Sequence, residues 1–235
     1  MKEKASNRIH YYENPQGPVI GTCSDKIIQK DGLYFRDING DGKLNTYKDW
    51  RKTPQERAQA LAEELSAEEK IGLLFLNSWK MGMEQEDKDF VDETGLLDEK
   101  PVEKGSSIFA TASTVGTTET IKDWKVRTFI LRSNPKPDEL ADWINEMNSL
   151  AEEGEHFIPV MVVSNSRNEN GEVVFGMNDA SGVFAAWPGT MGIAAAVKGD
   201  GLHIIDDFAD CIRREWDAVG MKKGYMYMAD CATDP

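Results

Sequence analysis

Two spacings of apolar residues alternate along this chain, one typical of helices and one typical of buried strands. Helical spacing predicts three helices, at 54–65, 138–150 and 202–216. Short runs that are apolar on both faces predict four strands, near 72–76, 128–132, 159–163 and 225–229. Because helices lie between most of these strands, the pattern predicts parallel strands joined by right-handed crossovers.

The predicted units occupy residues 53–235, and residues 1–52 follow a different pattern. Proline and glycine interrupt this first segment, so we expect an extended N-terminal arm with a short strand pair around 27–28 and 33–35. Residues 80–126 are acidic and then rich in glycine, serine and threonine, which predicts a long insertion that forms a partly mobile loop over the strand ends. The expected fold is therefore α/β, an incomplete (β/α) TIM-type barrel of about four parallel units.

Each predicted strand ends in a polar residue, and β/α barrels bind ligands at that end of their strands. These residues are Asn77, Arg132, Asn165 and Asp230. A closed barrel needs about eight strands, so a sheet of four has open edges that favour self-association or pairing with another chain.

One loop in the N-terminal arm has the spacing of an EF-hand calcium loop. Its candidate ligands are Asp37, Asn39, Asp41, Lys43 and Asn45. The last loop position, which should supply a bidentate carboxylate, is Lys48 instead. Two interpretations stay open: a weak Ca²⁺ site, or an Asx-rich turn that caps the following segment without metal.

The composition narrows the class of protein. A net charge of −14 argues against nucleic acid or an anionic membrane as a partner. The first eight residues lack the apolar core of a signal peptide, and no apolar run approaches the length of a membrane span. Three cysteines without paired spacing (Cys23, Cys211 and Cys231) favour reduced thiols and a cytoplasmic protein, and we expect no cofactor beyond the weak Ca²⁺.

Several blocks of the sequence, taken in order, resemble the N-terminal region of glycoside hydrolase family 3. The blocks lie at 37–51, 65–72, 158–167, 187–196 and 214–230. The resemblance implies a β-glucosidase-like enzyme that acts on β-linked glucosides or oligosaccharides with retention of configuration, through two carboxyl groups about 5–5.5 Å apart. It also implies that the aspartate nucleophile, the glutamate acid/base and further sugar-binding residues lie beyond Pro235. We therefore expect no catalytic residue in this chain and no activity from it alone.

Four residues are candidates for substrate binding: Asn165, Arg167, Trp187 and Asp230, and Asn168 is a further candidate for the same pocket. Only Asn165 carries over from the family, whereas Trp187 is a candidate because an aromatic face suits a sugar ring. Asn165 stands where many family members have an aspartate that holds sugar hydroxyls, and an amide lacks the charge-assisted strength of a carboxylate. Structural interpretations stay open beside these roles. Asn165 suits a turn, Trp187 suits an anchor packed beneath a loop, and Asp230 suits a buried carboxylate bonded to loop amides.

A function of another class also fits the predicted open sheet. The chain would then be a non-catalytic sugar-binding module, or a subunit that completes a barrel with another chain.

Overall fold

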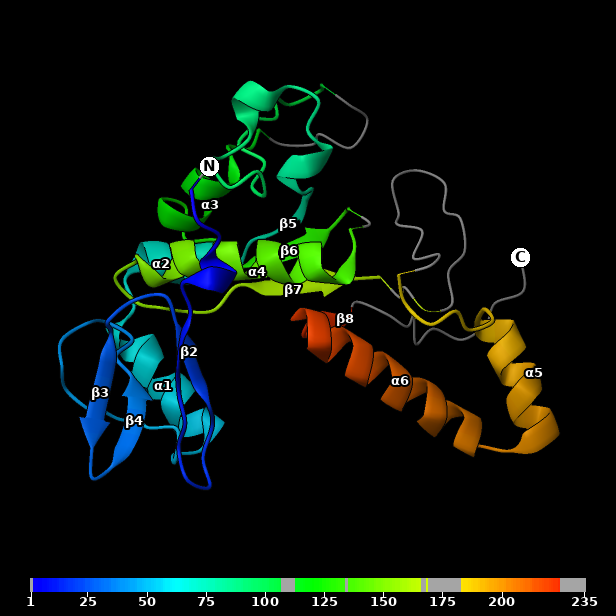
Figure 1. Cartoon of the computed structure of the whole chain (residues 1–235), viewed down its shortest axis with the longest axis horizontal. Helices are drawn as coiled ribbons and strands as arrows, with labels where there is room; N and C mark the ends of the chain where they lie inside the picture. The colour runs from blue at the N-terminus through cyan, green and yellow to red at the C-terminus, as the bar shows by residue number, and fades with distance from the viewer. Residues whose placement is uncertain (1, 107–112, 134, 166–167, 169–182, 225–235) are drawn as a thin grey trace. The chain divides into compact units, whose positions relative to one another are not determined.

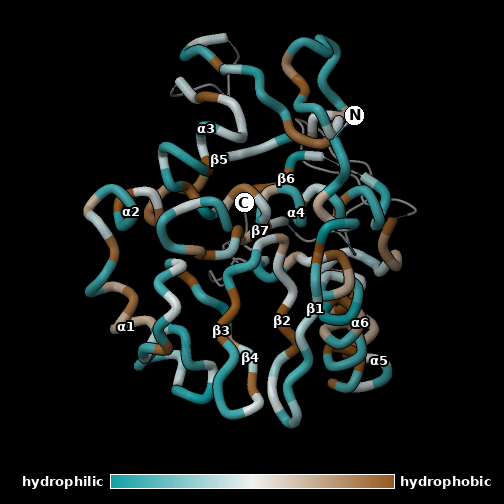
Figure 2. Tube along the Cα trace, turned by 60° about the vertical axis from the view of Figure 1, so that its left-hand side comes forward, coloured by the Kyte–Doolittle hydropathy of each residue, from teal (hydrophilic) through white to brown (hydrophobic). Residues whose placement is uncertain are grey.

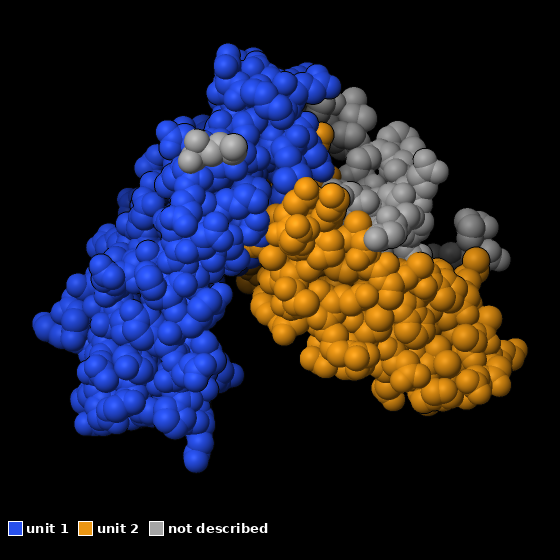
Figure 3. Space-filling view, in the orientation of Figure 1, with its two compact units in different colours: residues 1–77, 81–128, 142–160 blue, residues 78–80, 129–141, 161–235 orange. Residues whose placement is uncertain are grey.

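The computed structural model describes residues 2–106, 113–133, 135–165, 168 and 183–224. Two compact units divide the chain (Figure 3). Unit 1 consists of Met1–Asn77, Met81–Thr128 and Asp142–Val160, and unit 2 of Ser78–Lys80, Phe129–Ala141 and Met161–Pro235. The expected boundary at residue 52 lies inside unit 1, and the division into an arm and a half-barrel stays a prediction.

Two antiparallel strand pairs open unit 1 (Figure 1). A 3₁₀ turn at Ala5–Asn7 precedes the first pair, and the strands are β1 His10–Tyr12, β2 Ile20–Thr22, β3 Ile27–Lys30 and β4 Leu33–Arg36. Asp31 and Gly32 connect β3 to β4 with φ angles of 52° and 76°. Positive φ at both central residues is what a tight two-residue hairpin requires. The predicted strand pair is therefore confirmed.

Acidic residues of a long helix hold the N-terminal segment in unit 1. The helix is α4, Pro137–Glu152. Its buried Glu146 accepts a hydrogen bond from the backbone N–H of Ala5 at 2.7 Å, and Glu152 accepts one from the backbone N–H of Cys23 at 2.8 Å. These bonds to buried carboxylates are charge-assisted, and they hold the segment before β3 against α4.

Two short helices follow, each started by a capping box. In α1, Pro54–Glu64, Thr53 and Glu56 form the box, and in α2, Ala67–Gly72, Ser66 and Glu69 form it. The predicted strand near 72–76 is wrong over most of its length, because the second box starts a helix that runs to Gly72. The strand β5 begins only at its end and covers Leu76–Trp79.

Glu69 has a second role, since its carboxylate lies 3.0 Å from Nδ1 of the buried His156. Burial raises the pKa of Glu69, but the hydrogen bonds from the Ser66 backbone N–H and from His156 outweigh it and bring the pKa below its ordinary value. The carboxylate that caps α2 therefore also stabilises the interior of unit 1.

The described part of residues 80–126 contributes to the core of unit 1. Its regular elements are 3₁₀ turns at Gly82–Glu84 and Lys88–Phe90 and the helix α3, Thr117–Lys122. The Asp92 carboxylate accepts hydrogen bonds from the backbone N–H groups of Thr94, Leu96 and Leu97, and both leucines are buried. Sequence reasoning predicted a partly mobile loop and missed α3, because the pattern here is neither helical nor alternating.

The strands β5, β6 (Thr128–Leu131), β7 (Met161–Ser164) and β8 (Lys223–Gly224) form a four-stranded parallel sheet in that order. The parallel pairing of β7 with β8 joins Val163 to Lys223. Predicted strands at 128–132 and 159–163 are confirmed, whereas the one near 225–229 lies outside the described residues. The α/β class and the parallel sheet are therefore confirmed.

Two helices complete unit 2, α5 (Thr190–Asp200) and α6 (His203–Val219), and they pack against each other. Along α6 the trace changes repeatedly between hydrophilic and hydrophobic colours (Figure 2), and Phe208, Trp216 and Val219 form its buried face. Gly220 ends the helix with a φ of 86°. The predicted helix at 202–216 is confirmed, and α5 was not predicted.

The described residues bear on two expectations from composition, reduced cysteines and the lack of a membrane span. Cys23 and Cys211 are free thiols, and Cys231 lies outside the described part of the chain. Among the helices that the structure describes, none combines the length and the apolar character that a membrane span requires.

Candidate functional site

Two of the four predicted substrate-binding residues lie within the described part of the chain, both in unit 2. Asn165 directly follows β7 and is half-buried, at the carboxyl end of a parallel strand. Trp187 lies just before α5 and is also half-buried. Arg167 and Asp230 lie outside the described residues. The structure therefore confirms the position of Asn165 at a strand end but leaves its contact with a sugar as a prediction.

The strands β5 and β6 are neighbours in the parallel sheet, so their carboxyl ends lie at the same edge. Arg132, which follows β6, donates from its backbone N–H to the carbonyl oxygen of Trp79 at 2.7 Å and from Nε to Ser78 Oγ at 3.1 Å. The Trp79 and Phe129 rings pack edge to face with centroids 5.5 Å apart. This packing, in a geometry that aromatic pairs favour, fixes the end of β5 beside β6.

Asn168 is the centre of a buried hydrogen-bond network in unit 2. Its Nδ2 donates to Glu215 Oε2 at 2.6 Å and to the Ala185 carbonyl oxygen at 3.0 Å, and its Oδ1 accepts from Trp216 Nε1 at 3.2 Å. Its backbone carbonyl oxygen accepts from the N–H of Trp187 at 2.5 Å. Because both amide protons and Oδ1 bind protein groups, Asn168 positions the segment that carries Trp187 rather than offering its side chain to a ligand.

Glu215 is the acidic member of this network, and sequence reasoning gave it no role. Its two carboxylate oxygens accept from the backbone N–H of Ala185 at 3.0 and 3.2 Å, in addition to the bond from Asn168. It lies seven residues after Phe208 and four before Val219, which places it on the buried face of α6. A carboxylate at an apolar helical position was the signal that could have found it.

Trp187 packs against α6. Its ring centroid lies 5.2 Å from that of Phe208, with the planes at 59°. This contact is what the anchor interpretation predicts. Since the side chain is still half-exposed, its use as a platform for a sugar ring also stays a prediction.

The loop with the predicted calcium-loop spacing, in unit 1, binds a lysine ammonium through two of its carboxylates. Lys48 has no exposed side-chain surface, and its Nζ donates to Asp37 Oδ1 at 2.6 Å and to the Asp41 carboxylate. The other oxygen of Asp37 accepts from the N–H of Gly42 at 2.8 Å, and Asp41 accepts from the N–H of Lys43. These contacts are the ones expected of the metal-free interpretation.

The pKa values in this loop follow from the ion pair. Burial lowers the pKa of Lys48, but the hydrogen bonds to Asp37 and Asp41 outweigh it and leave the pKa above its ordinary value. The hydrogen bond from Lys48, together with that from the Lys43 backbone, lowers the pKa of Asp41 to about 2. Within the described residues, no cluster of three or more His, Cys, Asp or Glu side chains is arranged to hold a metal ion.

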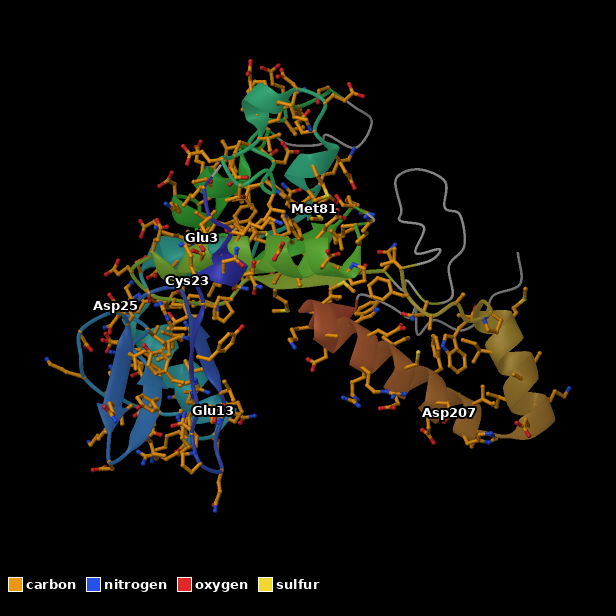
Figure 4. The ribbon with its side chains drawn as sticks, in the orientation of Figure 1. Glu3, Glu13, Cys23, Asp25, Met81 and Asp207 are labelled. Carbon is orange, nitrogen blue, oxygen red and sulfur yellow. The ribbon has the colours of Figure 1, made fainter. Side chains whose placement is uncertain are left out.

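A shallow groove of about 320 Å³ lies on unit 1 beside Cys23. Figure 4 labels this cysteine. The charged groups of the groove bind each other or the backbone: the Glu152 carboxylate accepts from Thr22 and Arg36, and Lys26 Nζ donates to the carbonyl oxygen of Glu152 at 2.8 Å. Burial and the Glu152 charge raise the pKa of the Cys23 thiol. A protonated thiol among neutralised charges is neither a nucleophile nor a ligand site.

Comparisons with known proteins find β-glucosidases. The chain is 32% identical over 221 residues to a periplasmic β-glucosidase/β-xylosidase of Dickeya chrysanthemi. This match covers 94% of the chain and 30% of the relative. The chain is 29% identical over 190 residues to the probable β-glucosidase C of Aspergillus oryzae, covering 80% of this chain and 26% of the relative. It is 26% identical over 219 residues to β-glucosidase C of Emericella nidulans. No family model matches the chain.

The chain is thus homologous to β-glucosidases over most of its length. It spans less than a third of the length of these relatives, 26–30%.

Proposed function

We propose, starting from this homology, that the chain is the N-terminal part of a glycoside hydrolase of family 3 that hydrolyses the O-glycosidic bonds of β-glucosides with retention. The observation that carries the proposal is the 32% identity to the Dickeya β-glucosidase/β-xylosidase over 94% of this chain. A match that runs along nearly the whole chain favours a shared fold rather than a shared motif.

The parallel sheet supports this proposal. Strand β6, helix α4 and strand β7 form a crossover unit, as in a β/α barrel, and β7 ends directly before Asn165. We propose that β5 to β8 are the first strands of such a barrel. Asn165 would then lie on the rim that binds substrate, where its amide can both donate to and accept from sugar hydroxyls.

The catalytic carboxyl pair, in this proposal, belongs to the part of the longer protein that this chain does not span. Glu215 lies in unit 2, but its carboxylate is bonded to Asn168 and Ala185 and so holds the loop before α5. A nucleophile needs a free oxygen facing the anomeric carbon. We therefore propose a positioning role for Glu215 and no turnover by this chain alone.

An assay with a chromogenic β-glucoside tests this assignment. The purified chain should release no chromophore above the buffer blank, while an active β-glucosidase under the same conditions gives the positive control. Release by this chain that Glu215→Gln abolishes, with unchanged circular dichroism, would mean that the carboxyl pair has been placed wrongly, because the substitution keeps the shape of the side chain but removes its charge and one acceptor oxygen.

A second candidate, a subunit that completes a barrel with another chain, is favoured by one observation. Apolar side chains are exposed in unit 1 where α2 leads into β5: Ile71, Leu74, Phe75 and Leu76, with Leu74 85% exposed. Trp124 is exposed as well, and its backbone carbonyl oxygen lies against Gly72. Contiguous apolar surface of this kind marks an interaction site.

Size-exclusion chromatography of the wild type and Leu74→Glu separates the two candidates. A barrel-completing subunit should elute as an oligomer or a complex that the substitution breaks, with unchanged circular dichroism. A wild type and variant that both elute as stable monomers would count against it.

A sugar-binding module would instead bind a non-hydrolysable β-glucoside in calorimetry without a partner. A titration that releases no heat would remove that alternative.

The compartment also remains a proposal. Free Cys23 and Cys211 favour the cytoplasm, whereas the Dickeya relative is named periplasmic. Cell fractionation with marker enzymes would decide between the two compartments.

A further inference from the structure

We propose that the loop from Asp37 to Lys48 is a calcium-type loop whose cation is built into the chain: the ammonium group of Lys48 occupies the place of the metal ion. The inference concerns unit 1 alone and does not depend on the proposed glycosidase function.

The sequence spacing and the contacts point to the same position. Asp37 and Asp41 stand at the first and fifth places of the loop, where calcium loops have carboxylate ligands. Both carboxylates accept from Lys48 Nζ, at 2.6 Å from Asp37 Oδ1. The two carboxylates that a metal ion would need as ligands therefore already bind the ammonium group of Lys48.

Lys48 stands at the twelfth place, which in calcium loops supplies a bidentate glutamate. A side chain at that place reaches the centre of the loop, and its Nζ brings the cation that the glutamate would have helped to bind. Gly40 and Gly42 have φ angles of 72° and 71°, which let the backbone turn around the ammonium.

Burial of the Lys48 side chain distinguishes this ion pair from one at the surface. The Lys48 side chain has no exposed surface, and an ammonium buried to that extent is tolerated only with good hydrogen bonds and paired charge. The adjacent Tyr47 ring is buried too, with its centroid 5.7 Å from Nζ. Lys43, in the same loop, is exposed and donates only its backbone N–H to Asp41, so the two lysines differ in role.

The loop connects parts of unit 1. The Asp37 N–H donates to the Lys26 carbonyl oxygen at 2.8 Å, and the Ile38 carbonyl oxygen accepts from the N–H of Phe157 at 2.9 Å. A fixed internal cation would hold this connection at any calcium concentration. A loop that needed free Ca²⁺ would open whenever the ion was removed.

Calorimetric titration with CaCl₂ and thermal unfolding with CaCl₂ or EDTA test the proposal on the full chain. The wild type should bind no calcium at millimolar concentration, and its Tm should not change with either additive. Lys48→Glu supplies the missing twelfth ligand and should bind one Ca²⁺, with a Kd of about 10⁻⁴–10⁻³ M or tighter, and gain Tm on calcium addition. Lys43→Glu, which adds the same charge to the same loop, should behave like the wild type.

Calcium binding by the wild type would overturn the proposal. So would a folded Lys48→Glu variant whose Tm does not respond to calcium, or a Lys43→Glu variant that responds equally. If Lys48→Glu does not fold without calcium, refolding on calcium addition supports the proposal, and failure to refold counts against it.

A second measurement needs no variant. Lysine acetylation followed by mass spectrometry should modify Lys48 at least about tenfold more slowly than Lys43, since the buried ion pair must open before Nζ can react. Equal rates for the two lysines would show that the ammonium is not held as the structure has it.

Discussion

Substitution of Asn168 by alanine tests whether the network in unit 2 holds the loop that carries Trp187. The variant removes one acceptor and two donors from a residue that is 2% exposed. The backbone bond between Trp187 and position 168 needs no side chain, so a merely local role of Asn168 predicts a small effect. A central role predicts that the loop loosens as a whole.

The magnitude follows from the groups that lose a partner. The buried Nε1–H of Trp216 is left without its acceptor, which costs about 1–3 kcal/mol. Glu215 loses a charge-assisted bond but keeps the N–H of Ala185, so its share is smaller. Together we expect unit 2 to lose about 2–4 kcal/mol of unfolding free energy.

Two readouts measure this loss: the midpoint of urea unfolding, and the hydrogen exchange of the Trp216 indole N–H, assigned by comparison with Trp216→Phe in NMR spectra. Asn168→Ala should lower the midpoint and speed the exchange. Asp207 is exposed on α6, the helix that carries Trp216. The unfolding free energy of Asp207→Asn should stay within about 0.5 kcal/mol of the wild type. An Asn168→Ala variant that matches Asp207→Asn in both readouts would refute the reasoning.

Further substitutions test the packing and electrostatics of each unit. A Cβ at Gly72 would lie 2.5 Å from the Lys125 carbonyl oxygen, so Gly72→Ala should cost about 1–3 kcal/mol in urea unfolding, and an unchanged midpoint would contradict that close approach. Gly220→Ala, at a φ of 86°, should lower the Tm by the equivalent of about 1 kcal/mol, whereas Gly199→Ala in the open surroundings of α5 should raise it; the reverse order would argue against the left-handed helix end. Glu69, whose pKa is lowered in the folded state, contributes stability above its unfolded pKa of about 4.3 that is lost as pH falls through the folded value. The difference in unfolding free energy between wild type and Glu69→Gln should therefore shrink from about pH 6 to about pH 3, and a constant difference would rule out this linkage.

Local signals in the sequence predicted local structure well. The helix at 54–65 and the strand pair around 27–28 and 33–35 were predicted correctly. In the structure the Thr53 capping box and the Asp31–Gly32 turn support them, and both act within a few residues, so they depend little on the rest of the fold. The apolar run after Ser66 was misread because a short run of this kind suits a helix end and a buried strand equally. Its capping box decided for the helix, and Leu74 is exposed rather than buried.

The candidate site could be predicted only in part, because its contacts join residues that are far apart in sequence. Asn165 was placed at a strand end from the strand pattern alone. The bond from Asn168 to Glu215 spans 47 residues, and no local pattern indicates it. Lys48 was recognised as a missing calcium ligand, but only the structure shows that its ammonium donates to Asp37 and Asp41.

Complementation tests the central claim, that this chain supplies the N-terminal part of a β-glucosidase-like hydrolase, most directly. The chain is co-expressed with the Dickeya β-glucosidase/β-xylosidase from which the matching segment has been deleted, and hydrolysis of a chromogenic β-glucoside is measured. We predict hydrolysis by the pair and by neither part alone. A pair that forms a stable complex yet releases no chromophore, or release by this chain alone, would contradict the claim.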